Sequence, residues 1–115
     1  MKLLMIVNES PWGSVLALTA YRLAEAAMQV AGNECAVFFR EDGVYNAVPG
    51  QVTDAGTQDL ARCWAGLAQA HGTRLLLCRS SSQRRLMACP AGPFQESGLA
   101  EMFGLMLTFD RVLTF

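Results

Sequence analysis

Short, continuously apolar runs recur along the chain, separated by longer segments of helical periodicity. The runs are residues 3–7, 35–39, 75–78 and 112–115. Apolar runs without polar alternation are typical of strands that are buried on both faces of a parallel sheet. We therefore expect a mostly parallel sheet of four to five strands.

Helical patterns lie between these runs. The first covers residues 14–31, with Gly32 as its expected end and one shared apolar face: Leu16, Ala20, Leu23, Ala27 and Val30. The second covers about residues 57–70, with Gly72 after it and these residues on its inner side: Leu60, Trp64, Leu67 and Ala68. Both patterns predict amphipathic helices that cover the sheet.

A third helix is expected over residues 99–108, after Ser97 as its N-cap residue. Glu101 is its one charged residue, so the segment is nearly apolar all round. A helix without a polar face is normally buried on more than one side. We expect this helix to contact another subunit as well as the sheet.

The order of these elements predicts an α/β fold, a three-layer α/β/α sandwich formed by a single domain over residues 1–115. In such sheets, functional groups gather on the loops at the carboxyl ends of the strands. Those loops are residues 8–13, 40–50 and 78–85.

The composition restricts where the protein can be located and what it can bind. The chain is 52% hydrophobic and only 17% charged, against about 25% charged in an average protein, so the apolar surplus should line a membrane, a groove or a subunit interface. The apolar core at residues 3–7 is too short for a signal peptide or a membrane span. We expect a cytoplasmic oligomer, and the net charge of −1 gives no basis for direct nucleic-acid binding.

Familiar catalytic motifs are absent from the sequence. It has no dinucleotide-binding glycine motif, no P-loop and no nucleophile elbow. The single histidine, His71, stands at the end of a predicted helix, and the cysteines lack zinc-site spacing. We expect no metal, no cofactor and reduced thiols.

Cys78 has the most promising position for chemistry. It ends an apolar strand and precedes Ser80, Ser81 and Ser82, which are N-cap candidates for a short helix through Arg84 and Arg85. Backbone N–H groups at a helix start and nearby guanidinium groups favour a thiolate. The alternative is that Cys78 is a small apolar residue at the end of a strand.

The remaining cysteines are weaker candidates. Cys35 begins a core strand and Cys63 lies in a predicted helix, so burial explains both. Cys89 lies in a loop rich in Pro and Gly and is a candidate resolving thiol for Cys78. Arg84 and Arg85 either cover a helix surface or hold an anion near Cys78.

Two loops at the same sheet edge are candidates for binding a small ligand. Tyr45 and Asn46 follow Asp42 and Gly43, which suit a turn. The loop at residues 8–13 either binds a ligand or simply connects a strand to a helix.

Several segments together resemble the DsrE/TusD family of sulfur-relay proteins. They are residues 38–46 (FFREDGVYN), Cys78 followed by residues 83–85 (QRR), residues 97–99 (SGL) and residues 110–115 (DRVLTF). The similarity covers nearly the whole chain.

This resemblance implies a small α/β/α protein, a persulfide carrier of the sulfurtransferase class, that assembles with itself or with paralogous subunits. The family's strand-end cysteine, matched here by Cys78, accepts a sulfur from a donor protein and passes it to an acceptor protein by persulfide exchange. TusD-like members serve 2-thiouridine formation in tRNA, and DsrE-like members serve sulfur oxidation. Such exchange needs a reactive, accessible sulfur on a loop. Arg79, Arg84 and Arg85 are expected to stabilise its anion, and Tyr45 and Asn46 to support the site.

The chain departs from the family pattern around Cys78. Residues 79–82 (RSSS) replace small apolar residues, Leu86 replaces a common glycine, and the segment 86–94 is short. Two further hypotheses therefore stand beside the relay: a non-catalytic subunit with a structural Cys78, and a small-ligand binder.

Overall fold

The fold is built on one parallel sheet. The computed structural model describes residues 1–50, 59–87, 90 and 92–115. In this part of the chain the strands are β1 (Lys2–Val7), β2 (Glu34–Phe39), β3 (Arg74–Cys78), β4 (Phe94–Ser97) and β5 (Arg111–Thr114). They form a five-stranded sheet in the order β4-β3-β2-β1-β5, with every neighbouring pair parallel.

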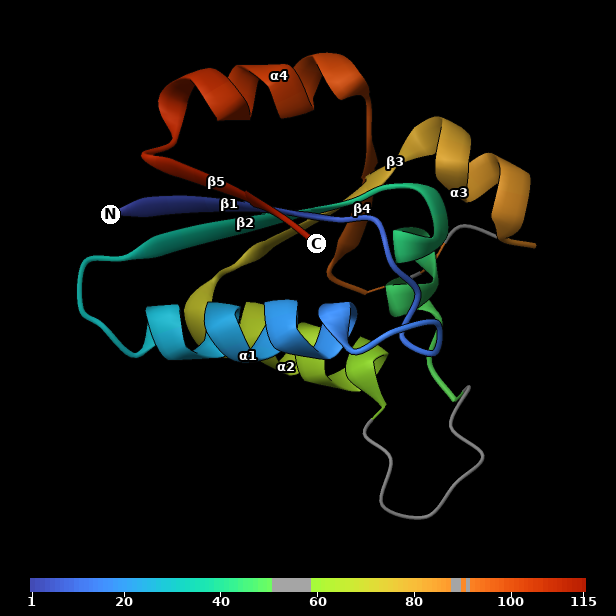
Figure 1. Cartoon of the computed structure of the whole chain (residues 1–115), viewed down its shortest axis with the longest axis horizontal. Coiled ribbons are helices and arrows are strands. Elements are labelled where there is room, and N and C mark those ends of the chain that lie inside the picture. Colours follow the sequence, from blue (N-terminus) through green and yellow to red (C-terminus); the bar gives the residue numbers. More distant parts are fainter. Residues whose placement is uncertain (51–58, 88–89, 91) are drawn as a thin grey trace.

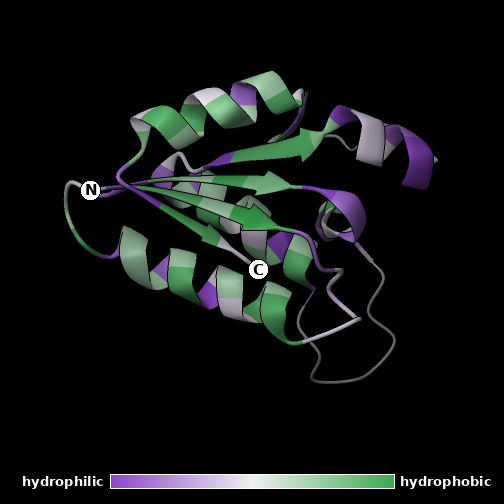
Figure 2. Ribbon diagram, turned by 45° about the horizontal axis from the view of Figure 1, so that its top comes forward, coloured by the Kyte–Doolittle hydropathy of each residue, from purple (hydrophilic) through white to green (hydrophobic). Residues whose placement is uncertain are grey.

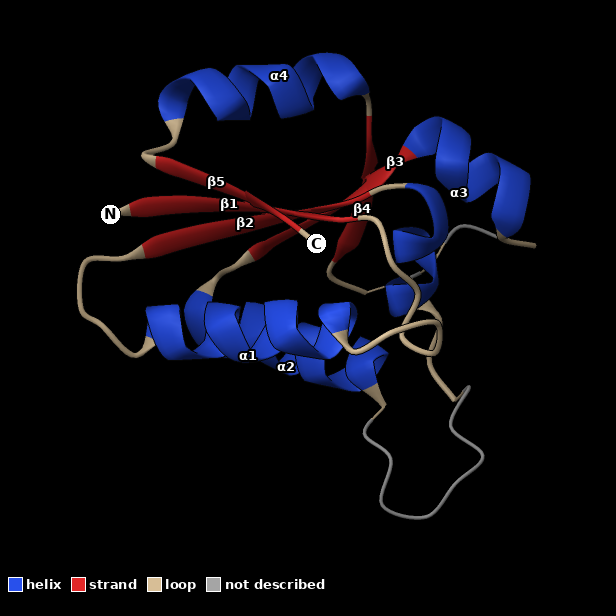
Figure 3. Cartoon of the chain, in the orientation of Figure 1, coloured by secondary structure: helices blue, strands red, loops and turns tan. Residues whose placement is uncertain are grey.

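Helices cover both faces of this sheet (Figure 1, Figure 3). The helices are α1 (Leu16–Met28), α2 (Leu60–His71), α3 (Arg79–Arg85), α4 (Leu99–Thr108) and a 3₁₀ helix, η1 (Glu41–Ala47). Met5 and Val37 belong to the core on the α1 and α2 side, whereas Leu4 and Phe38 belong to the core under α4. Successive strand residues thus face opposite layers, and the expected three-layer α/β/α sandwich is confirmed.

The four apolar runs match β1, β2, β3 and β5 in position, but only the three central strands among them are buried as the runs predict. β1, β2 and β3 are buried from their second residue to their last. The run at 112–115 was expected to be buried on both faces, yet β5 is an edge strand and Leu113 is 37% exposed. β4 at the other edge was not predicted, because its two inner residues, Gln95 and Glu96, break the apolar pattern.

Helix α1 packs through part of the expected face, with Ala20 buried and Ala27 partly buried, but its larger side chains are not part of the contact. Its buried residues are Ala17, Ala20 and Ala24, while Leu16 and Leu23 are about two-fifths exposed at 40% and 39%. Small side chains let the helix approach the sheet closely, so the alanines take the inner face. The helix also ends at Met28, before Gly32.

Helix α2 agrees with its pattern wherever it is described. Leu60, Trp64 and Leu67 are buried, and Gly72 ends the helix in the left-handed conformation (φ +70°) with its N–H on the Ala68 carbonyl. The expected start near residue 57 lies outside the described residues.

Helix α4 has the expected bounds but a free outer side. Met102 and Leu105 are buried against the sheet, whereas Leu107 is 88% exposed. The single chain therefore buries only one side of it. Its N-cap residue is Gly98 rather than Ser97, whose hydroxyl instead donates to the Glu101 carboxylate. None of the helices in the described part of the chain is long and apolar enough to span a bilayer.

Candidate active site around Cys78

Cys78 is both the last residue of β3 and the N-cap residue of α3. Its side chain belongs to the core under α4, beside Phe38 and Leu76, and the residue is only 4% exposed. The sequence suggested a sulfur on an accessible loop, with serines capping the next helix. The structure corrects both points, because no loop separates β3 from α3 and the serines lie inside the first turn of the helix.

Two serines of that first turn act on the Cys78 thiol. Burial is the largest influence on the pKa of Cys78 and raises it, but the hydroxyls and backbone N–H groups of Ser80 and Ser81 lower it. The net result is a pKa below the ordinary value for a cysteine. Ser80 Oγ lies 3.4 Å from Cys78 Sγ. Hydrogen bonds to the charged form of a group stabilise that form, so this site favours the thiolate.

The other described cysteines differ in this respect. Burial raises the pKa of Cys35 to about 12. Burial first, and then the carboxylates of Asp59 and Glu25, raise the pKa of Cys63. Of the three free cysteines that the structure describes, Cys78 alone has a lowered pKa. Cys89, the candidate resolving thiol, lies outside the described residues.

Helix α3, which follows Cys78 directly, is joined to η1 by a hydrogen bond and two ion pairs. The backbone N–H of Glu41 donates to Ser81 Oγ at 3.0 Å. Arg85 reaches the same segment, with Nε 2.9 Å from Asp42 Oδ1 and a terminal nitrogen 3.0 Å from Glu41 Oε2. These contacts join residues that are about forty positions apart in sequence (40 for Glu41 and Ser81).

The arginines of α3 are arranged differently from the expectation. Arg85 is held by two carboxylates, Arg79 Nε lies 3.9 Å from Glu96 Oε2, and Arg84 is exposed. The lowered pKa of Cys78 comes from Ser80 and Ser81, not from the arginines. Figure 2 shows α3 as a mainly hydrophilic helix beside the apolar strands.

Arg40 follows β2 directly and was not singled out from the sequence. Its backbone N–H donates to the Val7 carbonyl at 2.9 Å, so the sheet ladder continues one residue beyond β2. Phe39 pairs with Leu77, which puts Arg40 beside Cys78. The Arg40 Nε is buried without a hydrogen-bond partner in the part of the chain that is described.

Tyr45 and Asn46 support the loops of this edge rather than the sulfur. Asn46 is fully buried, and its amide nitrogen donates to the carbonyls of Glu9 and Gly43 at 3.1 and 2.9 Å. Its amide oxygen accepts the Trp64 indole N–H at 3.3 Å. The Tyr45 ring lies 5.5 Å from that of Trp12, centroid to centroid.

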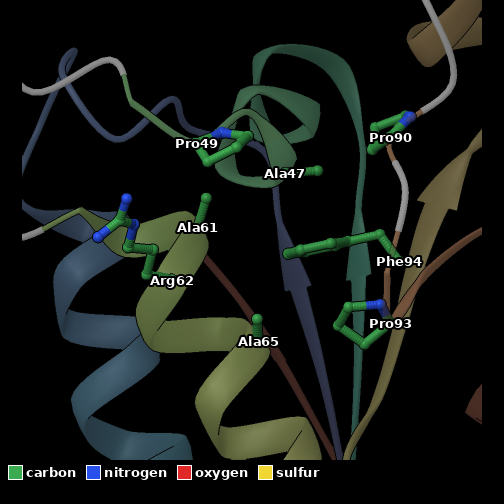
Figure 4. Close-up of a pocket in the computed structure, with 8 residues that line it drawn as sticks. All are labelled: Ala47, Pro49, Ala61, Arg62, Ala65, Pro90, Pro93 and Phe94. Atoms are coloured by element: carbon green, nitrogen blue, oxygen red, sulfur yellow. The ribbon is translucent and has the colours of Figure 1, made fainter.

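The two loops proposed for a small ligand therefore pack on each other. A pocket of about 220 Å³ lies between the end of η1, helix α2 and the start of β4 (Figure 4). Its lining is almost wholly apolar: Ala47, Pro49, Ala61, Arg62, Ala65, Pro90, Pro93 and Phe94. These positions include neither the loop at residues 8–13 nor Cys78.

The residues that the sequence missed share one feature. Glu41 reaches Ser81 through its backbone N–H, and Arg40 follows the last paired residue of β2, so the positions of both depend on the fold. The one available signal was the run of three serines after Cys78, which we interpreted as caps. Among the described residues, no group of three His, Cys, Asp or Glu side chains gathers as a metal site would require.

Comparison with known proteins shows to which family this chain is similar. The family model of the DsrE/DsrF-like family matches residues 1–115. The chain is 33% identical to the "Sulfurtransferase TusD homolog" of Vibrio parahaemolyticus, covering 96% of this chain and 95% of that protein. It is 30% identical to "Sulfurtransferase TusD" of Salmonella paratyphi B, with 100% of both covered.

A solved structure agrees in fold. The ychN protein from E. coli superposes with a TM-score of 0.87 at 22% identity, covering 100% of this chain and 99% of that one. At this level of identity the match supports the architecture alone. The full-length family match and the two relatives carry the assignment further, and the chain belongs to the DsrE/DsrF-like family.

Proposed function

We propose that the chain is a sulfur-relay sulfurtransferase in which Cys78 carries the sulfur as a persulfide. The observation that carries this proposal is the position of Cys78 between the end of β3 and the start of α3, where Ser80 Oγ lies 3.4 Å from its Sγ. The lowered pKa of Cys78 agrees with this position. The thiolate is the form that attacks sulfur. The full-length relatives named sulfurtransferase TusD support the same class of reaction.

The reaction is a thiol–persulfide exchange. The Cys78 thiolate attacks the outer sulfur of a persulfide on the donor protein, and a new S–S bond forms while the donor's own S–S bond breaks. The donor leaves as a thiolate, and Cys78 holds the persulfide. An acceptor thiolate then attacks the outer sulfur, which returns Cys78 to its thiolate form without an external oxidant.

The burial of Cys78 constrains the partners. Because the residue is only 4% exposed, donor and acceptor proteins have to reach a sulfur that the chain itself largely covers. Arg79 follows Cys78 directly, and its side chain is 58% exposed; we assign it to the persulfide anion. Arg84 is exposed to solvent, and we assign Arg85 an indirect role, because it holds α3 against η1.

The similarity to TusD-like proteins also suggests a pathway for the transferred sulfur and an oligomeric assembly. TusD-like members serve 2-thiouridine formation in tRNA, so we propose that pathway rather than sulfur oxidation. The exposed side of α4, with Phe103 and Leu107, would be covered by a second copy or a paralogous subunit.

One alternative has an observation in its favour. Cys78 packs with Phe38 and Leu76 in an apolar core, as a purely structural cysteine would. In that case the chain is a non-catalytic subunit of a DsrE-like assembly.

Mass spectrometry separates these two functions. The protein is incubated with glutathione persulfide, alkylated and digested with trypsin. Cleavage after Arg74 and Arg79 releases residues 75–79 (LLLCR), in which Cys78 is the one cysteine. We expect this peptide to gain the mass of one sulfur atom.

The matched control is Cys63→Ser, which should leave the loading of this peptide intact, whereas Cys78→Ser should abolish it. If peptide 75–79 never carries extra sulfur while the peptide with Cys63 or Cys35 does, the relay through Cys78 is rejected in favour of the structural role.

A further inference from the structure

Three residues stand in a row at the carboxyl ends of the central strands, on the face of the sheet that α4 covers. The row before it consists of paired apolar residues on β1, β2 and β3, all in the core under α4: Ile6, Phe38 and Leu76. Successive strand residues face opposite layers, so the same face is taken two positions later by Asn8, Arg40 and Cys78. We call these three residues the carboxyl-end row.

The sheet continues as far as this row. The backbone N–H of Asn8 donates to the Phe115 carbonyl at 2.7 Å, and that of Arg40 donates to the Val7 carbonyl at 2.9 Å. The backbone of Arg40 is extended, with φ −126° and ψ 163°, so the alternation of faces holds at this residue. The register of β2 against β3 places Arg40 beside Cys78, and neighbouring strands lie only about 4.8 Å apart. The side chain of Arg40 is therefore long enough to reach the sulfur.

Two polar atoms of the carboxyl-end row are open. Asn8 Oδ1 and Arg40 Nε are buried and have no hydrogen-bond partner in the described part of the chain. A terminal nitrogen of Arg40 lies 4.0 Å from Glu41 Oε1, but the other oxygen of that carboxylate lies 3.0 Å from Arg85. Glu41 is thus shared between two arginines. A buried donor without a partner is unfavourable, so the surroundings of Arg40 fit an anion that accepts its N–H.

We propose that Arg40 is the anion-binding residue of the Cys78 site, and that its Nε–H donates to the negatively charged outer sulfur of the Cys78 persulfide. This proposal rests on the proposed function of Cys78. The persulfide extends the cysteine by one sulfur atom, and Arg40 is the neighbouring cation on the same face of the sheet. Hydrogen bonds between a guanidinium and an anion are among the stronger ones in proteins.

Arg79 differs from Arg40 in its surroundings. We assigned Arg79 to the same anion because it follows Cys78 directly, but its Nε already lies 3.9 Å from Glu96 Oε2 and its side chain is 58% exposed. The side chain of Arg40 is 32% exposed, and its Nε is buried. A partly buried charge is screened less by water and salt than an exposed one. Arg40 should therefore contribute more than Arg79 to holding the outer sulfur.

The test compares the rates at which Cys78 reacts with iodoacetate, an anion, and with iodoacetamide, its neutral analogue, followed on tryptic peptide 75–79. Both reagents react with the thiolate, so the ratio of the two rates does not depend on the thiolate fraction and reports positive charge at the sulfur. We expect Arg40→Gln to lower this ratio about three- to tenfold, and Arg40→Lys to keep most of it. The matched control is Arg22→Gln, an exposed arginine on α1, which covers the opposite face of the sheet.

A second measurement tests the contact with the outer sulfur itself. Each protein is equilibrated with a fixed ratio of glutathione persulfide to glutathione, and the fraction of peptide 75–79 that carries extra sulfur is measured. Arg40→Gln should lower the equilibrium constant for loading about three- to tenfold, whereas Arg22→Gln should match the wild type. Circular dichroism checks the fold of each variant. If Arg40→Gln does not fold, Arg40→Met, which keeps an unbranched side chain, replaces it.

The outcomes separate this inference from the proposed function. An unchanged rate ratio in the folded variant, or an equal fall in Arg22→Gln, overturns the role of Arg40 in binding anions. A wild type that loads sulfur, with the same equilibrium constant in Arg40→Gln, leaves the relay standing and overturns the contact with the outer sulfur. A wild type that never loads sulfur while the rate ratio falls in Arg40→Gln shows that the relay is wrong, although Arg40 then still binds anions at Cys78.

Discussion

Gly43 is the residue on which the position of η1 depends most directly. A Cβ atom at this position would lie 2.0 Å from the Val7 carbonyl oxygen and 2.8 Å from its carbon. Both atoms are backbone at the end of a central strand, so neither can move cheaply. A glycine here lets η1 lie directly on the end of β1 and brings Glu41 within reach of Ser81.

Gly43→Ala should therefore lower the free energy of unfolding by about 2–4 kcal/mol, as measured by urea unfolding at a fixed protein concentration. The matched control is Gly66→Ala in α2, where an added Cβ meets nothing within 4 Å. Removing a helical glycine should raise stability by about 0.5–1 kcal/mol. Equal effects of the two substitutions would contradict the close contact with Val7.

The sequence identified the candidate nucleophile but not the groups around it. Cys78 was recognisable because an apolar strand, a cysteine and a polar helix start follow one another directly along the chain. The partners of Ser81 and Arg85 were not, since they lie 40 and 43 positions away. The arginine pair suggested an anion site, whereas Arg85 is compensated by Asp42 and Glu41.

At the scale of elements, the apolar runs predicted the three central strands and the edge strand β5, but not the edge strand β4. β1, β2 and β3 were recognisable because both faces of each are covered. β4 was not recognised as a strand because an edge strand tolerates polar residues such as Gln95, which break the apolar pattern. The inner face of α1 was misjudged because side-chain size, rather than hydrophobicity alone, decides which residues approach a sheet.

The contact between α3 and η1 makes a prediction at this scale. Arg85 is 23% exposed at its side chain and pairs with two carboxylates, so Arg85→Ala should lower the free energy of unfolding by about 0.5–1.5 kcal/mol. Concentrated salt should reduce the difference. Arg84→Ala, the neighbouring exposed arginine, should stay within about 0.5 kcal/mol of the wild type. A larger loss for Arg84→Ala than for Arg85→Ala would argue against this contact in solution.

At the scale of the whole molecule, the many apolar residues lie in two kinds of place, the interior and the surface. Part of them form the two cores on either side of the sheet. Other apolar side chains are exposed on the single chain, among them Leu107 (88%) and Phe103 (55%) on α4. Neighbouring exposed apolar side chains on one helix are typical of a surface that another subunit covers.

We therefore expect an oligomer held in part by the outer side of α4. In sedimentation velocity at low micromolar concentration, the wild type should be larger than the 12.5 kDa of one chain. Leu107→Glu combined with Phe103→Glu should shift it to the single-chain mass, because charged side chains would have to be desolvated in the interface. Val15→Glu, at an exposed apolar position (73%) just before α1, should leave the assembly unchanged. A wild type that sediments as a single chain would show that α4 does not mediate self-association, and its exposed side would then have to be covered by a different protein.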